Sequence, residues 1–189
     1  MTSLEHFPIP LLGFAAFSGT GKTTLITRLL PELTKRGLRI GMVKHSHHDI
    51  EMDNPNKDSY KLRKAGACQM VLASPHRTVL FVEQDAPVEP ALITQLNWLN
   101  TNELDLVLVE GFRHEAFTKI ELYRPSLGKP ILAKEDEHII AIASDTEKSE
   151  LILNNIELTG KNIDYLNIND INQICEYIFG YIKRSYNNR

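Results

Sequence analysis

Eight residues between an apolar run and a helical pattern have the composition of a phosphate-binding loop. The segment from Phe17 to Thr24 reads Phe-Ser-Gly-Thr-Gly-Lys-Thr-Thr. Glycines let backbone N–H groups approach a phosphate chain, and a helix that begins near Lys22 adds its N-terminal amides and dipole. In a P-loop the lysine reaches the β- and γ-phosphates and the next hydroxyl binds Mg²⁺, roles that fall to Lys22 and Thr23. We therefore predict a nucleoside triphosphate site formed by Ser18, Gly19, Thr20, Gly21, Lys22, Thr23 and Thr24.

The first position of this loop departs from the P-loop consensus, because Ala16 stands in place of a glycine. A methyl group fits there if the local φ is negative. A Rossmann dinucleotide site is disfavoured, since Thr24 stands where its third glycine belongs. The following strand also ends in Lys44-His45 instead of the acidic residue that binds a ribose.

Two acidic residues flank the apolar run 106–109, and one of them is expected beside Mg²⁺. Ligands of parallel sheets bind outside the carboxyl ends of the strands. Glu110 closes the run, whereas Asp105 opens it about 16 Å away. Glu110 is therefore the predicted metal-side and catalytic residue, together with Lys22, and acts through a bound water or on the attacking water. Gly111 can offer its amide to the γ-phosphate. The alternative is that Glu110 is a solvated residue at the end of the strand with no role in binding.

Three of the seven histidines follow the second predicted strand, in the sequence Lys44-His45-Ser46-His47-His48-Asp49. His47, His48 and Asp49 can ligate a transition metal, because imidazole and carboxylate groups suit such ions. They can equally hydrogen-bond phosphates, with Asp49 in the outer shell of Mg²⁺. A polar surface loop is the third interpretation, and the sequence leaves all three open.

A predicted helix over residues 58–67 carries Lys61, Arg63 and Lys64, with Asp58 as its N-cap. These basic side chains either contact an anionic ligand or partner, or form a solvated helix face.

The elements that position these residues alternate between strand and helix patterns. Residues 11–17 are a continuous apolar run, residues 22–36 have apolar positions at helical spacing, and residues 39–44 read as a strand. Together they form the βαβ unit of a parallel sheet. Further strands are predicted over 69–74, 78–83, 104–109, 119–123, 138–143 and 165–168, and further helices over 58–67, 90–100 and 170–184.

This order predicts an α/β fold with a single P-loop NTPase-like domain over residues 1–189. The short connection between 69–74 and 78–83 favours an antiparallel pair, so the expected sheet is mixed but mostly parallel, with helices on both faces. Residues 1–10 are expected to be an N-terminal extension, and residues 165–189 a C-terminal strand and helix.

The composition is that of an ordinary globular chain, with 42% apolar and 24% charged residues among 189. The net charge of −3 provides no overall positive field for nucleic acid or an anionic membrane surface. No apolar run reaches the roughly 18 residues of a membrane helix, and the first residues lack a signal-peptide pattern. We therefore expect a cytoplasmic protein with reduced thiols at Cys68 and Cys175.

Four ordered segments resemble the family of molybdopterin-guanine dinucleotide biosynthesis adaptor proteins, called MobB: AAFSGTGKTTL, KHSHHD, KDSYKLRKAGA and LVLVEGF. The resemblance covers roughly residues 11–145. It implies a GTP-binding homodimer, at most a slow Mg²⁺-dependent GTPase, that assists a molybdopterin guanylyltransferase in joining GMP to molybdopterin. Molybdopterin itself or a molybdoenzyme-maturation partner are further candidates for binding.

The resemblance also assigns individual residues. Gly19, Gly21, Lys22, Thr23 and Thr24 match the nucleotide loop, Glu110 and Gly111 match the second motif, and the histidine loop is matched by His47, His48 and Asp49.

Guanine selection has no NKxD motif to support it in this sequence. Asp145 follows an apolar strand and can accept hydrogen bonds from the guanine N1–H and 2-amino groups. The competing interpretation makes Asp145 an ordinary N-cap of a following turn.

Two other functions share the same phosphate loop. One is a metallochaperone-type GTPase that uses the histidine loop. The other is a small-molecule kinase, which the absence of an arginine cluster in the loop after Arg124 disfavours. The homodimer is consistent with an exposed strand edge at residues 78–83.

Overall fold

The computed structural model describes residues 3–46, 50–147 and 162–187. The chain divides into two compact units, one formed by Met1–His45 with Leu92–Arg189 and the other by Ser46–Ala91. The larger unit contains the phosphate loop and the run that ends at Glu110. Among the described residues, no helix is long and apolar enough to cross a membrane.

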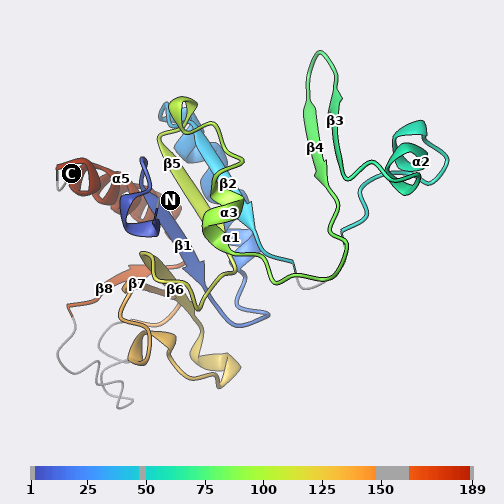
Figure 1. Ribbon diagram of the computed structural model, residues 1–189. Coiled ribbons are helices and arrows are strands. Elements are labelled where there is room, and N and C mark those ends of the chain that lie inside the picture. Colours follow the sequence, from blue (N-terminus) through green and yellow to red (C-terminus); the bar gives the residue numbers. More distant parts are fainter. Residues whose placement is uncertain (1–2, 47–49, 148–161, 188–189) are drawn as a thin grey trace. The chain divides into compact units, whose positions relative to one another are not determined.

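A six-stranded sheet forms the centre of the larger unit (Figure 1). Every neighbouring pair in it is parallel. The strands Leu11–Ala15 and Leu106–Glu110 are buried along their whole length, because both faces of the sheet are covered there. Their order across the sheet is β2 (Ile40–Lys44), β5 (Leu106–Glu110), β1 (Leu11–Ala15), β6 (Lys119–Tyr123), β7 (Ile139–Ser144) and β8 (Asp164–Asn167).

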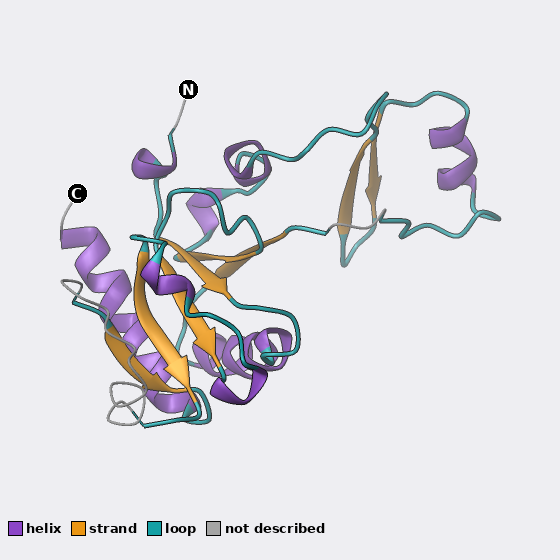
Figure 2. Ribbon diagram, turned by 90° about the horizontal axis from the view of Figure 1, so that it is seen from below, coloured by secondary structure: helices purple, strands orange, loops and turns teal. Residues whose placement is uncertain are grey.

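Alternate residues of the strands face opposite layers of the larger unit. Leu12 and Leu108 belong to a buried cluster with residues of α1 (Lys22–Lys35) and α5 (Ile171–Asn187). Their neighbours Leu11 and Val107 belong to a second buried cluster with residues of α3 (Leu92–Leu96). The predicted α/β fold with helices on both faces is therefore confirmed (Figure 2). Short 3₁₀ turns cover Leu4–His6, Thr101–Glu103, Pro125–Leu127 and Leu132–Lys134.

The smaller unit contains α2 (Asp58–Lys64) and the hairpin of β3 (Gln69–Ala73) and β4 (Thr78–Val82). The hairpin is antiparallel, as predicted. It forms a separate two-stranded sheet, so the larger sheet is wholly parallel rather than mixed. The local pairing was readable from the short turn, whereas membership of a sheet depends on residues far away in the chain.

Candidate functional site

The loop after β1 has a backbone that only glycine adopts easily. Gly19 has φ +84° and Gly21 has φ +96°, values that strain any residue with a Cβ. Thr20 between them is buried, and its hydroxyl and amide both donate to the carbonyl of Phe17, at 2.7 and 3.4 Å. Phe112 is the only non-glycine residue with a positive φ in the described parts of the chain. Ala16 therefore has the negative φ that its methyl group requires.

The amino end of α1 is open to an anion. Gly21 is its N-cap and provides no side-chain hydrogen bond, and the first turn carries no acidic residue. The N–H groups of a first helical turn lack partners within the helix, and the dipole makes that end positive. Thr23 and Thr24 are exposed in this turn. The loop and the helix together have the donors that a phosphate chain needs.

Glu110, at the carboxyl end of β5, lies between Lys22 at the start of α1 and Lys44 at the carboxyl end of β2. Its side chain is about 10% exposed; Oε1 lies 3.7 Å from Nζ of Lys22, and both carboxylate oxygens lie 3.2 Å from Nζ of Lys44. Lys44 pairs directly with Glu110 across β2 and β5. This arrangement brings together two cations that suit phosphates and a buried oxygen ligand that suits Mg²⁺. Glu110 and the hydroxyl of Thr23 therefore fit a magnesium ion chemically.

The residues after Glu110 are held against the end of β2. Gly111 has φ +90°, and a Cβ on it would lie 2.6 Å from Cβ of His45. The ring of His45 stacks on Phe112 at 4.9 Å, and the amide of His45 donates to the carbonyl of Glu110 at 2.8 Å. Only glycine fits at position 111. The positive φ of Phe112, +52°, had no signal in the sequence.

Arg124 connects the phosphate loop to Asp145. Its Nε donates to the carbonyl of Thr20 at 2.9 Å, and one terminal nitrogen donates to Oδ2 of Asp145 at 2.5 Å. Arg124 was not among the site residues predicted from the sequence. Its position directly after a strand beside β1 was the available signal.

Several predicted residues are thus brought together, and others are not. Lys22 meets Glu110, and Asp145 meets the loop through Arg124. Asp105 lies at the opposite end of its strand, where it accepts from the amide of Arg39 at 2.7 Å. The predicted ligands in the histidine loop lie outside the described residues: His47, His48 and Asp49.

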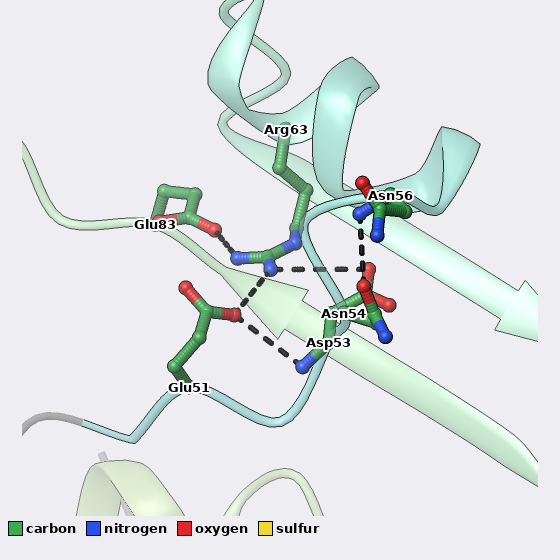
Figure 3. A network of polar contacts seen from close by, with 6 residues as sticks. All are labelled: Glu51, Asp53, Asn54, Asn56, Arg63 and Glu83. Carbon is green, nitrogen blue, oxygen red and sulfur yellow. Dashed lines mark hydrogen bonds and ion pairs between the residues drawn. The ribbon is translucent and has the colours of Figure 1, made fainter.

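Arg63 is not available to an anionic ligand or partner. Its side chain is 5% exposed and donates to Glu83 at 2.5 Å and to Glu51 at 2.8 Å. Figure 3 shows these two contacts. A third carboxylate, Asp53, lies 3.9 Å away, and the guanidinium lies 4.4 Å from the ring centroid of Phe81. The three basic residues of this helix therefore do not form one common face, either for solvent or for a ligand, because Arg63 is buried. Arg63 instead joins α2 to the segment before it and to the end of β4.

A cavity of about 800 Å³ lies beside Phe17 in the larger unit. The most buried of its charged lining residues is Lys119, which is about 1% exposed and donates to the Glu115 carbonyl at 2.7 Å and to Asp136 at 2.9 Å. Its lining has four carboxylates, from Glu115, Glu135, Asp136 and Glu137, and two cations, from Arg113 and Lys119. Excess negative charge disfavours a phosphate in this cavity, whereas the loop after β1 has backbone donors and a cation that suit one.

The chain is similar to known proteins of one family in both sequence and structure. Residues 11–145 match the family described as "Molybdopterin guanine dinucleotide synthesis protein B". The "Molybdopterin-guanine dinucleotide biosynthesis adapter protein" of Escherichia coli K12 is 44% identical over 177 residues, which cover 93% of this chain and 95% of the relative. The protein of the same description from Haemophilus influenzae is 38% identical over 170 residues, covering 90% and 88%.

A solved structure described as molybdopterin-guanine biosynthesis protein B superimposes on the chain with a TM-score of 0.60. Its sequence is 25% identical, and the match covers 90% of this chain and 99% of the other.

Proposed function

Since the chain belongs to the family of molybdopterin guanine dinucleotide synthesis protein B and thus acts in molybdenum cofactor biosynthesis, we propose that it binds GTP with Mg²⁺ as an adaptor. A partner guanylyltransferase then attaches GMP to molybdopterin. The observation that carries this proposal is the meeting of Lys22 and Glu110, 3.7 Å apart, beside the open amino end of α1. Polar pairs of this kind at a glycine-lined helix start suit a nucleoside triphosphate with its metal.

The residues predicted at the nucleotide site have distinct roles in this proposal. The amides of residues 18–24 surround the phosphates, and Lys22 contacts the β- and γ-phosphates. Thr23 and Glu110 hold Mg²⁺, Glu110 directly or through water, with Asp49 as a proposed outer ligand. The amide of Gly111 faces the γ-phosphate. Asp145 accepts hydrogen bonds from the guanine base, which selects GTP over ATP.

Hydrolysis by the protein alone is proposed to be slow. Fast GTPases use an arginine at the transferred phosphate and a residue that orients the attacking water. Arg124 is bonded to Thr20 and Asp145 instead. GTP therefore acts mainly as a bound ligand of the adaptor, and the partner carries out the committed chemistry.

A homodimer is proposed from the smaller unit. Arg63 is the only buried residue among those that the structure describes between residues 46 and 91. The hairpin exposes Val71 at 64% and Leu80 at 40%, which pair across the strands on one face. An isolated two-stranded hairpin is marginally stable in water. A second copy that covers this face would bury apolar area that the unit lacks by itself.

The experiment that tests the GTP site compares Lys22→Ala with Lys35→Ala by calorimetry. Lys35 lies at the other end of α1, its side chain is 69% exposed, and its ammonium pairs with Glu32 at 2.7 Å. We expect Lys22→Ala to weaken GTP binding at least about 100-fold, because a charge-assisted phosphate contact is lost. Lys35→Ala should bind like the wild type. Equal GTP affinity in the wild type, Lys22→Ala and Lys35→Ala would contradict the assignment of residues 18–24 as a phosphate-binding loop.

A further inference from the structure

Three adjacent parallel strands bring distant residues to one edge of the larger sheet. β1 pairs with β6, and β6 pairs with β7, with Ala15 beside Glu121 and Tyr123 beside Ser144. The phosphate loop follows β1, Arg124 follows β6, and Asp145 follows β7. Since carboxyl ends of parallel strands meet at the same edge, Arg124 lies between the phosphate loop and Asp145.

The carbonyl of Thr20, which accepts a hydrogen bond from Arg124, has a well-defined position in the phosphate loop. Thr20 is 2% exposed, and its amide and hydroxyl both bond to Phe17. Its carbonyl therefore has a defined position when it accepts from Nε of Arg124 at 2.9 Å. Another nitrogen of the guanidinium lies 3.8 Å from the place where a Cβ of Gly21 would stand. The arginine thus lies directly against the loop.

The side chain of Asp145 is less buried than Thr20. It lies in a bend after β7, and its side chain is 30% exposed. The carbonyl of Ser144 accepts from Ile168 at 2.9 Å, which fixes the backbone just before it. The carboxylate itself is bonded through Oδ2 to Arg124 at 2.5 Å. A guanidinium is planar and holds its five N–H donors in fixed directions, so one arginine can donate to both the loop and the carboxylate in a defined geometry.

We propose that Arg124 is a positioning residue for nucleobase selection, which holds the carboxylate of Asp145 at a fixed place relative to the phosphate loop. This inference rests on the proposed GTP site. A carboxylate selects guanine only when its oxygens meet N1–H and the 2-amino group while the phosphates occupy the loop. An exposed aspartate without a partner would lose side-chain freedom on binding, and pre-positioning by Arg124 removes that loss. Each carboxylate oxygen has two acceptor sites, so Oδ2 can bond to Arg124 and to the base together.

The test compares the affinities for GTP, ITP and ATP in the wild type, Arg124→Gln, Asp145→Asn, the double variant and Arg124→Lys. Inosine lacks the 2-amino group, and adenine lacks both donors. Arg39→Gln is the matched control, since Arg39 is an ion-paired arginine at the opposite edge of the same sheet. Thermal unfolding of each ligand-free variant establishes that it is folded.

We expect Arg124→Gln and Asp145→Asn each to lower the GTP-to-ATP affinity ratio at least about tenfold and to reduce the preference for GTP over ITP. The double variant should lose little more than the worse single variant, because the two residues act as one unit. Arg124→Lys should fail to restore the GTP-to-ATP affinity ratio, since the lysine ammonium has no planar set of donors in fixed directions.

Other outcomes separate this inference from the proposed function. If Arg124→Gln weakens GTP and ATP equally while Asp145→Asn lowers the ratio, Arg124 only supports the loop and the inference is overturned. If Asp145→Asn leaves the ratio unchanged while Lys22→Ala abolishes binding, the base assignment and the inference both fail, but the phosphate site stands. If the wild type binds no nucleotide, the proposed function itself fails.

Discussion

Nζ of Lys22 lies 3.7 Å from Oε1 of Glu110, although 88 positions separate the two residues in the chain (110 − 22). The parallel pairing of β1 with β5 produces this approach, because Glu110 lies beside Phe14 at the end where the phosphate loop begins. Lys44 reaches the same carboxylate from β2. One buried carboxylate therefore balances two cations at the proposed triphosphate site.

Replacing Glu110 by Gln should separate metal binding from phosphate binding. The variant loses a hard anionic ligand, so the gain in GTP affinity on adding Mg²⁺ should shrink at least about tenfold. Affinity without Mg²⁺ should be equal or higher, because Lys22 and Lys44 are no longer neutralised. Calorimetry with Mg²⁺ and with a chelator measures both quantities. Glu103→Gln, on the surface at the opposite edge, is the control, and an unchanged Mg²⁺ effect in Glu110→Gln would contradict the metal assignment.

The hairpin of the smaller unit should determine the oligomeric state. Val71→Lys combined with Leu80→Lys places two charges on the exposed apolar face of β3 and β4, and burying them would cost more than the contact gains. We expect sedimentation velocity to show a dimer for the wild type and a monomer for this variant. Val88→Lys serves as the control, since Val88 is 68% exposed outside the strands. A wild-type monomer, or a dimeric double variant, would argue against this interface.

Glu121 should make stability depend on pH near neutrality. The side chain is 1% exposed and accepts from the amides of Leu132 and Ala133, each at 2.8 Å. Burial raises the pKa of this carboxyl to about 7, more than the two amides lower it. Because the folded pKa lies above the unfolded one, the contribution of Glu121 to stability is complete below about pH 4.5 and is lost as the pH rises through 7.

Urea unfolding at pH 5 and pH 8 measures this effect. Relative to Glu121→Gln, the wild type should lose up to about 2 kcal/mol of unfolding free energy between these pH values. Glu137→Gln, which alters a side chain that is 83% exposed, should follow the wild type. A constant difference between wild type and Glu121→Gln would show that the carboxyl does not titrate in this range.

Arg63 should hold the smaller unit together. Arg63→Met leaves Glu51, Asp53 and Glu83 close to one another without their shared cation. We expect proteolysis within residues 46–91 to become at least about tenfold faster, because local opening becomes easier. Lys61→Met is the control on the same helix, where the lysine side chain is 66% exposed. Equal cleavage rates in Arg63→Met and Lys61→Met would show that the network contributes little.

Local patterns predicted the elements with useful accuracy. The strand Lys119–Tyr123 has the expected bounds, and α1 begins at Lys22 as expected. Helix α3 is shorter than the predicted 90–100, since only Leu92–Leu96 is helical. Glycines at 19 and 21 were recognisable because a positive φ is a requirement of the local backbone. The βαβ unit, the glycine-rich loop and the place of Glu110 at the end of its strand therefore followed from the sequence. Phosphate binding by this loop and metal binding by Glu110 stay predictions.

Which charged groups meet depends on the tertiary structure. In the sequence, Arg63 is one of three basic residues on a predicted helix. In the structure it is buried and pairs with Glu51, which precedes the hairpin in the chain, and with Glu83, which follows it. Arg124 lies 104 positions from Thr20 and 21 from Asp145, and no local period relates them. Their contacts result from the order of strands β1, β6 and β7. Strand order arises from long-range packing of apolar faces, whereas sequence patterns report only the face that each strand buries.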